Sequence, residues 1–202
     1  MHKFVAIVGT NSDNSTNRKL LQFMQKHFAD QATIELVEIK GLPMFNKPED
    51  KQIPAQAQAM AKQIDQADGV IISTPEYDHS APAALMNALE WLSYYVNPFA
   101  DKPVMITGAS YGSLGTSRAQ EHLRQILDSP ELRARIMPSS EFFLGHSLQA
   151  FDDDGNLVDQ TKLAKLEDLF ADFQTFVDIT KQLNHANAAN KQEIHDIDWA
   201  NR

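Results

Sequence analysis

The chain has 202 residues, of which 43% are hydrophobic, and this size and composition are typical of one globular domain with a full core. Its net charge of -9 argues against nucleic acid and against an anionic membrane as partners, because both attract basic surfaces. It contains no cysteine, which excludes disulfides, thiolate catalysis and zinc–sulfur sites. The start, MHKFVAIVG, has no signal-peptide pattern, and no apolar run reaches membrane-spanning length, so we expect a cytoplasmic protein.

Short apolar runs alternate with helical patterns along the chain. The runs predict strands at Lys3–Val8, Thr33–Ile39, Gly69–Thr74, Pro103–Thr107 and Arg135–Leu144, with Pro138 as a point where the last strand can break. The helical spacing of apolar residues predicts helices at Asn17–Phe28, Pro54–Gln66, Pro82–Tyr95, Thr116–Leu127 and Lys162–Leu183.

This alternation requires crossovers between parallel strands, with helices on both faces of the sheet. We therefore expect an α/β fold, a flavodoxin-like three-layer sandwich whose five-stranded parallel sheet has the order 2-1-3-4-5. Residues 1–183 would form this domain, and residues 184–202 a polar, poorly packed C-terminal tail. In such a sheet a ligand lies beyond the C-terminal ends of the strands, near the switch point between the first and third strands.

The loop after the first predicted strand, GTNSDNSTN, is rich in hydroxyl and amide side chains. Together with the free N–H groups of the following helix, these groups can bind a phosphate. The glycine spacing matches neither a dinucleotide-binding fingerprint nor a P-loop. Ser15 or Thr16 could equally cap the helix, and the two roles are compatible.

Two further loops follow strands at the same edge. In PEYDHSAP, Tyr77 and His79 can stack on a planar ring, although the composition is also typical of a tight turn. In GASYGSLGTSR, the glycines indicate either close approach to a ligand or a flexible connection. Because three such loops meet at one sheet edge, a ligand site there is more strongly indicated than by any single loop.

The segments GTNSDNSTN, PEYDHSAPAALMNALEW and GASYGSLGTSRAQEHLRQIL resemble the motifs of the NADPH-dependent FMN reductase family, which includes quinone, azo-dye and chromate reductases. The resemblance extends from Met1 to about Leu183. It implies FMN as cofactor, NADPH or NADH as hydride donor, and no metal. The residues that it implies for cofactor binding are Thr10, Ser12, Ser15, Thr16 and Asn17 at the phosphate, Pro75, Glu76, Tyr77, Asp78 and His79 at the ring, and Ser110, Gly112 and Gly115 at its far edge.

The resemblance further implies a ping-pong transfer of hydride from NAD(P)H through flavin N5 to a small acceptor: a flavin, quinone, azo compound or metal oxyanion. No protein side chain is then needed as a catalyst. Ser12 departs from the family, which often has an arginine there, and Arg18 could compensate. Asp78 stands where asparagine is usual, and Arg118 is expected near the NADPH phosphates.

The aromatic residues Trp91, Tyr94 and Tyr95 end one predicted helix. They are consistent with a homodimer or homotetramer, and also with ordinary core packing.

Two other functions remain open. GASYG matches the G-x-S-x-G pattern of serine hydrolases, with Ser110 as nucleophile and Asp152 and His185 as partners, but no oxyanion-loop sequence accompanies it. A non-catalytic electron carrier of the flavodoxin type also fits the acidic composition. The segment FDDDGNLVD lacks the ligand spacing of a calcium loop and predicts a tight turn.

Overall fold

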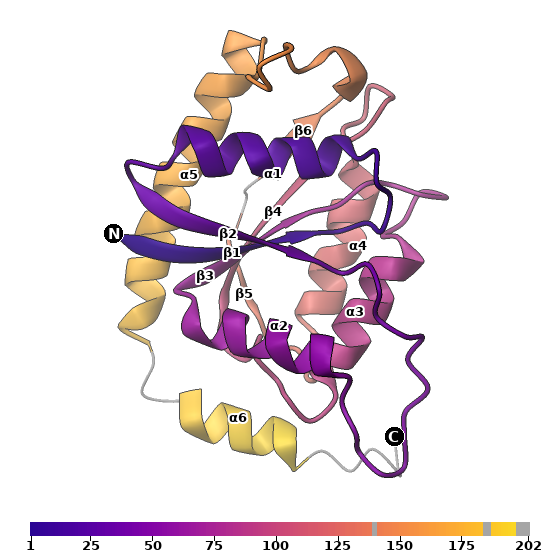
Figure 1. Cartoon of the computed structure of the whole chain (residues 1–202). Coiled ribbons are helices and arrows are strands. Elements are labelled where there is room, and N and C mark those ends of the chain that lie inside the picture. Colours follow the sequence, from indigo (N-terminus) through magenta and orange to yellow (C-terminus); the bar gives the residue numbers. More distant parts are fainter. Residues whose placement is uncertain (139–140, 184–186, 197–202) are drawn as a thin grey trace.

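A computed structural model of the protein describes residues 1–138, 141–183 and 187–196 (Figure 1). Its parallel sheet has the order β2-β1-β3-β4-β5, with β6 also paired to β4, which confirms the predicted topology. The strands are β1 (His2–Val8), β2 (Ala32–Glu38), β3 (Gly69–Ser73), β4 (Pro103–Ala109), β5 (Arg135–Ile136) and β6 (Phe142–Leu144).

The last predicted strand is split, as its proline suggested. β5 pairs with the start of β4, where Pro103 lies opposite Arg135, and β6 pairs with its end, where Thr107 lies opposite Phe142. Pro138 lies in the interruption, and proline has no N–H to donate to a neighbouring strand. The outer edge of β4 is therefore covered by two short strands instead of one.

The helices lie on both faces of the sheet (Figure 1), with α1 and α5 on one side and α2, α3 and α4 on the other. They are close to the predicted ranges: α1 (Thr16–His27), α2 (Ala55–Gln66), α3 (Ala83–Ser93), α4 (Ser117–Leu127) and α5 (Gln160–Lys181). None of the helices in the described part of the chain is long and apolar enough to cross a membrane.

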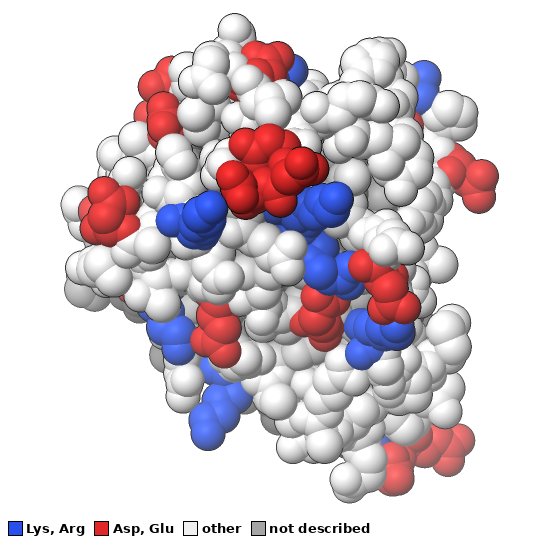
Figure 2. Space-filling model, turned by 45° about the horizontal axis from the view of Figure 1, so that its top comes forward, with Lys and Arg blue, Asp and Glu red and all other residues white. Residues whose placement is uncertain are grey.

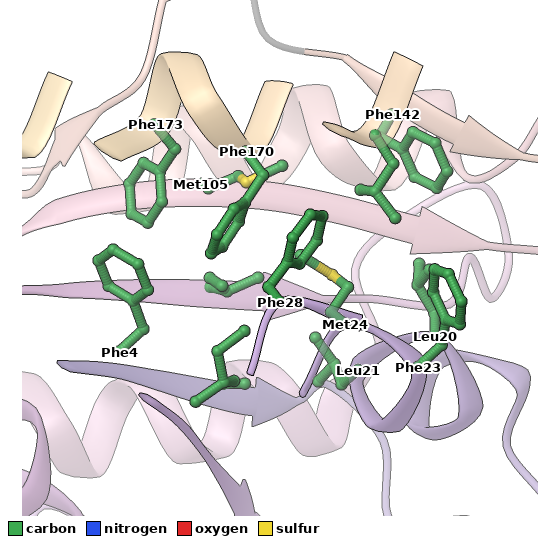
Figure 3. Packing of buried hydrophobic residues seen from close by; sticks show 14 of the residues in the cluster. Phe4, Leu20, Leu21, Phe23, Met24, Phe28, Met105, Phe142, Phe170 and Phe173 are labelled. Carbon is green, nitrogen blue, oxygen red and sulfur yellow. The ribbon is translucent and has the colours of Figure 1, made fainter. Parts of the chain in front are cut away.

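The sheet separates two hydrophobic clusters of different composition. Along β1, Phe4 packs toward α1 and α5 and Val5 toward the opposite helices, and both are fully buried. The α1–α5 side is rich in phenylalanine, and Figure 3 shows Phe28 and Phe170 facing each other between helix and sheet. Their rings are stacked with centroids 3.9 Å apart, whereas the opposite cluster is mainly aliphatic.

The C-terminal region differs from the expected poorly packed tail, because residues 187–195 form a helix, α6 (Asn187–His195). Ile194 is only 2% exposed. Lys191 pairs with Asp65 at 2.7 Å and Glu193 with Arg133 at 2.7 Å, which attaches α6 near the start of β3 and β5. The domain boundary at residue 183 stays a prediction, and residues 197–202 lie outside the described residues.

The aromatic residues Trp91 and Tyr94 at the C-terminal end of α3 are buried in contacts within this chain. Trp91 and Tyr94 are each 3% exposed. Trp91 Nε1 donates to the Pro43 carbonyl at 2.7 Å, and the Tyr94 hydroxyl donates to the Pro48 carbonyl at 2.7 Å. Phe45 packs edge-on against both rings. These contacts hold the proline-containing loop over α3, so these two rings are accounted for by packing and do not argue for a dimer.

Candidate functional site

The loops after β1, β3 and β4 converge on a cavity of about 570 Å³, which is within the size range of small-molecule pockets. This is the sheet edge at which the sequence predicts a ligand site. The residues that line the cavity are Ser12, Asn14, Ser15, Thr16, Asn17, Pro75, Glu76, Tyr77, His79, Ala109, Ser110, Tyr111, Gly112, Ser113, Leu114 and Arg118.

Three of the residues expected at the cofactor do not line this cavity: Thr10, Asp78 and Gly115. Thr10 is 1% exposed and lies beneath the loop, where its hydroxyl is 3.4 Å from that of Tyr77 and accepts from the Ser12 N–H at 3.2 Å. The lining also contains residues to which the sequence analysis assigned no role: Asn14, Ala109, Tyr111, Ser113 and Leu114. All of them belong to the loop after β1, to the loop after β4 or to the end of β4. The sequence could have indicated them only through their position next to the motif residues.

The start of α1 is capped as the sequence allowed. Ser15 is the N-cap, and its hydroxyl accepts a hydrogen bond from the Arg18 N–H at 3.2 Å. The Thr16 hydroxyl is 2.8 Å from that of Ser147 in a buried contact. The first-turn N–H groups of a helix have no carbonyl partner within the helix, so this end can still receive an anion.

Asn17 holds two walls of the cavity together. Its side chain is 2% exposed, and its Nδ2 donates to the Ala109 carbonyl at 2.8 Å. Its Oδ1 accepts from the Ala109 N–H at 2.8 Å and from the Ser73 hydroxyl at 2.9 Å. The side chain therefore joins α1 to β3 and β4, a structural role that the motif did not reveal.

The elbow after β3 is a two-residue tight turn. Tyr77 and Ser80 exchange backbone hydrogen bonds of 3.1 and 2.9 Å. Between them Asp78 and His79 have φ of 48° and 60°, the left-handed conformation of a type I′ turn. Aspartate and histidine are both found in this conformation more often than most residues other than glycine. The tight turn that the composition suggested is thus confirmed, and it leaves the Tyr77 side chain 50% exposed beside the cavity.

Glu76 caps α4 from a distant loop. The N-cap residue Thr116 has φ of 73° and makes no side-chain capping bond. Instead, Glu76 Oε2 accepts from the N–H groups of Arg118 and Ala119 at 3.1 and 3.3 Å, and its Oε1 lies 3.4 Å from the Arg118 guanidinium. A carboxylate at a helix N-terminus is also favoured by the helix dipole. This bond fixes the elbow after β3 against the start of α4.

The loop after β4 is bonded to the segment after β6. The backbone N–H of Ser110 donates to the Leu144 carbonyl at 2.9 Å, and the backbone N–H of Ser147 donates to the Ser110 carbonyl at 3.0 Å. Gly112 lines the cavity, and a Cβ placed on it would meet no protein atom within 4 Å. The protein's own packing therefore does not require glycine there. The open space above Gly112 is what a ligand in close contact with the backbone needs.

The serine hydrolase alternative gains no support from this geometry. The Ser110 hydroxyl donates to the Gly112 carbonyl at 3.1 Å. Asp152 accepts from the N–H and side-chain amide of Asn156, within the tight turn predicted for this segment. His185 lies outside the described residues. Among the residues that the structure describes, no group of three or more His, Asp or Glu side chains is arranged to hold a metal ion.

The chemistry of the cavity fits FMN. Its lining includes the N-terminus of α1 with the hydroxyls of Ser12 and Ser15, which suits a phosphate. It also includes Pro75, Tyr77 and Tyr111, which suit a flat aromatic ring. On the face displayed in Figure 2, acidic and basic residues occur in small interspersed groups, without a broad basic area.

The chain is similar to several reductases that are named for NADH or NAD(P)H. The family model for NADPH-dependent FMN reductase matches residues 2–149. The NADH:(hydroxy)cinnamate reductase subunit CrdA of Vibrio ruber is 56% identical over 191 residues, which cover 94% of this chain and 95% of that protein. Subunit 2 of the NADH-dependent flavin reductase of Lactobacillus johnsonii is 45% identical over 181 residues, 87% of this chain and 97% of that protein. The structure of FerB, an NAD(P)H:(acceptor) oxidoreductase from Paracoccus denitrificans, aligns with a TM-score of 0.75 at 26% identity and covers 90% of this chain and 98% of FerB.

Proposed function

Because this chain belongs to the NADPH-dependent FMN reductase family and is an FMN-dependent NAD(P)H oxidoreductase, we propose that the cavity at the ends of β1, β3 and β4 binds FMN and is the site of reaction. The observation that carries this proposal is the open space over Gly112 in a cavity whose lining combines the N-terminus of α1 with exposed aromatic rings. When bound, FMN supplies the two-electron hydride chemistry that amino-acid side chains cannot perform. The part of the protein is to bind and orient the reactants.

The residues of the β1 loop and the start of α1 would hold the phosphate. Neutral hydroxyls and backbone N–H groups form this part of the cavity, so the charge in each contact comes from the phosphate alone, without the second charge that an arginine or lysine would add. The elbow residues Pro75 and Tyr77 and the facing loop at Ser110 and Gly112 would hold the ring. Asn17 and Glu76 support the cavity by hydrogen bonds between its walls: Asn17 joins α1 to the end of β4, and Glu76 joins the elbow after β3 to the start of α4.

We propose NADH as the preferred donor. The relatives from Vibrio ruber and Lactobacillus johnsonii are named for NADH, and the Arg118 guanidinium already contacts Glu76 and His79. A cation directed at the additional phosphate of NADPH would strengthen its binding, and Arg118 is engaged elsewhere. The ratio of kcat/KM for NADH and NADPH tests this choice, and a ratio in favour of NADPH would contradict it.

We propose a planar aromatic molecule as the acceptor. Tyr77 and Tyr111 line the cavity and are 50% and 60% exposed, so each presents a ring on which a flat acceptor can stack. The two relatives are named for (hydroxy)cinnamate and flavin, which are both aromatic. A quinone, a flavin and a hydroxycinnamate should therefore have a higher kcat/KM than chromate. Tyr111→Ala should raise KM for the aromatic acceptors, whereas Val158→Ala, at an exposed position outside the cavity, should not.

The first experiment is anaerobic mixing of the FMN-loaded protein with NADH while the visible flavin absorbance is followed. Rapid bleaching, followed by recovery when an aromatic acceptor is added, is the expected result. Failure of the protein to bind FMN would contradict the proposed site. Binding of FMN without bleaching by NADH or NADPH would contradict the proposed use of the site as a reductase centre.

The proposal includes a homodimer or homotetramer in the cytoplasm, where reduced nicotinamide cofactors are available. Leu114 and Leu148 belong to two loops that are hydrogen-bonded to each other, and each residue is at least 50% exposed. Exposed apolar side chains in such a group are typical of an interface. Sedimentation velocity should give a dimer or tetramer, and Leu148→Glu should shift it toward monomer. A wild-type monomer would contradict self-assembly.

A further inference from the structure

Arg18 occupies a position in α1 where a cation is unfavourable. With Ser15 as the N-cap, Arg18 is the third residue of the helix, where a capping box would have Glu or Gln. The positive end of the helix dipole repels an arginine there. Its presence therefore calls for a compensating contact elsewhere.

The compensating contacts connect the end of β2 to the loop after β1. Arg18 Nε and Nη2 donate to the two carboxylate oxygens of Glu38 at 2.6 and 2.8 Å. Its Nη1 donates to the carbonyl oxygens of Ser12 and Asp13 at 2.7 and 3.0 Å. The Arg18 side chain is 17% exposed, and the bond to Glu38 raises its pKa further above the ordinary value. A planar guanidinium provides this fixed, forked geometry, which a lysine cannot.

The direction of these carbonyl groups determines where the neighbouring N–H groups point. In a planar trans peptide, the carbonyl of one residue and the N–H of the next point in opposite directions. The N–H groups of Asp13 and Asn14 therefore point away from the Arg18 guanidinium. Ser12 and Asn14 line the cavity, whereas Arg18 and the intervening residue Asp13 are not among its lining residues.

We propose that Arg18, held by Glu38, is a positioning residue that directs the backbone N–H groups of residues 13 and 14 toward the phosphate of FMN. The Arg18 guanidinium thus acts through the loop and does not touch the phosphate. The sequence had suggested a different role, in which Arg18 replaces the family's arginine at position 12. This inference rests on the proposed function, because it assigns the phosphate to this end of the cavity.

The change in FMN affinity when Glu38 loses its charge distinguishes this positioning role from direct binding of the phosphate by Arg18. If Arg18 bound the phosphate directly, removing the charge of Glu38 would release Arg18 and tighten FMN binding. Removing a nearby negative charge would also tighten binding of an anion by simple electrostatics. Positioning through the loop predicts the opposite sign, because Arg18 loses the group that holds it in place.

The test measures the dissociation constants of FMN and of riboflavin, which lacks the phosphate, by quenching of flavin fluorescence. Glu38→Gln and Arg18→Met should each weaken FMN binding about tenfold, the effect of losing one phosphate hydrogen bond, and change riboflavin binding less than about twofold. Arg18→Lys keeps the charge without the fork and should also weaken FMN binding. Glu35→Gln is the matched control, since Glu35 also lies on β2 but pairs with Lys3, and it should bind both flavins as the wild type does.

Unchanged or tighter FMN binding by Glu38→Gln would overturn the positioning role while leaving the proposed function intact. Equal weakening of FMN and riboflavin would overturn it as well, because the loop would then support the whole fold and not the phosphate. A wild-type protein that binds FMN no more tightly than riboflavin would contradict the phosphate site itself, and with it this inference.

Discussion

Replacement of Asn17 by Ala should destabilise the fold even when no cofactor is bound. The substitution leaves the N–H and carbonyl of Ala109 and the hydroxyl of Ser73 without their partner, in a site where Asn17 is 2% exposed. A buried polar group without a partner costs about 1–3 kcal/mol. Because the three groups are adjacent and can relax together, we expect a total loss of about 3–5 kcal/mol. This is a large part of the about 5–15 kcal/mol by which domains are stable.

The measurement is urea unfolding of the FMN-free protein followed by circular dichroism, with the slope of the transition checked against that of the wild type. Asn14→Ala is the matched control, because Asn14 is exposed and lines the same cavity. It should change the free energy of unfolding by less than about 0.5 kcal/mol. A loss of less than about 1 kcal/mol in Asn17→Ala would refute the reasoning, since the residue would then act only on the ligand.

Three further predictions separate folding from binding. Gly112→Ala should keep the wild-type free energy of unfolding but weaken FMN binding. Gly108→Ala should lower the free energy of unfolding in urea by about 1–3 kcal/mol, because its Cβ would lie 2.8 Å from a backbone carbonyl oxygen. Equal stability of the two variants would contradict this. Glu76→Ala should lose about 1–2 kcal/mol because α4 loses its cap, and a wild-type urea midpoint would contradict the capping role. The backbone N–H of Asn156 lowers the pKa of Asp152, so this bond contributes stability above the ordinary pKa of Asp and loses it as pH falls through the lowered value. The difference in urea midpoint between wild type and Asp152→Ala should therefore shrink on acidification, and a difference that grows would contradict the sign.

The fold was predictable because its signal is local. The run Gly69–Thr74 has three consecutive aliphatic residues without polar alternation, as is typical of a strand buried on both faces, and it corresponds to β3. The break at Pro138 was also predictable, because proline cannot take part fully in strand pairing. The C-terminal helix α6 was missed because its composition is polar, with Ile194 as the buried apolar residue among the α6 side chains that the structure describes.

The location of the candidate site was predictable, but the contacts that shape it were not. Position after a strand was sufficient to select Ser12 and Tyr77, which both line the cavity. The partners of Asn17 and Glu76 lie 92 and 42 residues away along the chain. A local motif carries no information about such distant pairs. The sequence therefore did not predict that Asn17 also joins α1 to β3 and β4, or that Glu76 also caps α4.

The unequal distribution of phenylalanine between the two faces of the sheet provides an internal reporter for nuclear magnetic resonance. Ring currents from Phe28 and Phe170 act on nearby methyl groups of this cluster, whose methyl-bearing members include Leu21 and Ile71. Those methyl signals should be spread widely, whereas methyl signals from the aliphatic cluster under α2, α3 and α4 should stay close together. A one-dimensional proton spectrum recorded during unfolding can therefore follow the α1–α5 layer separately, without any label or added probe.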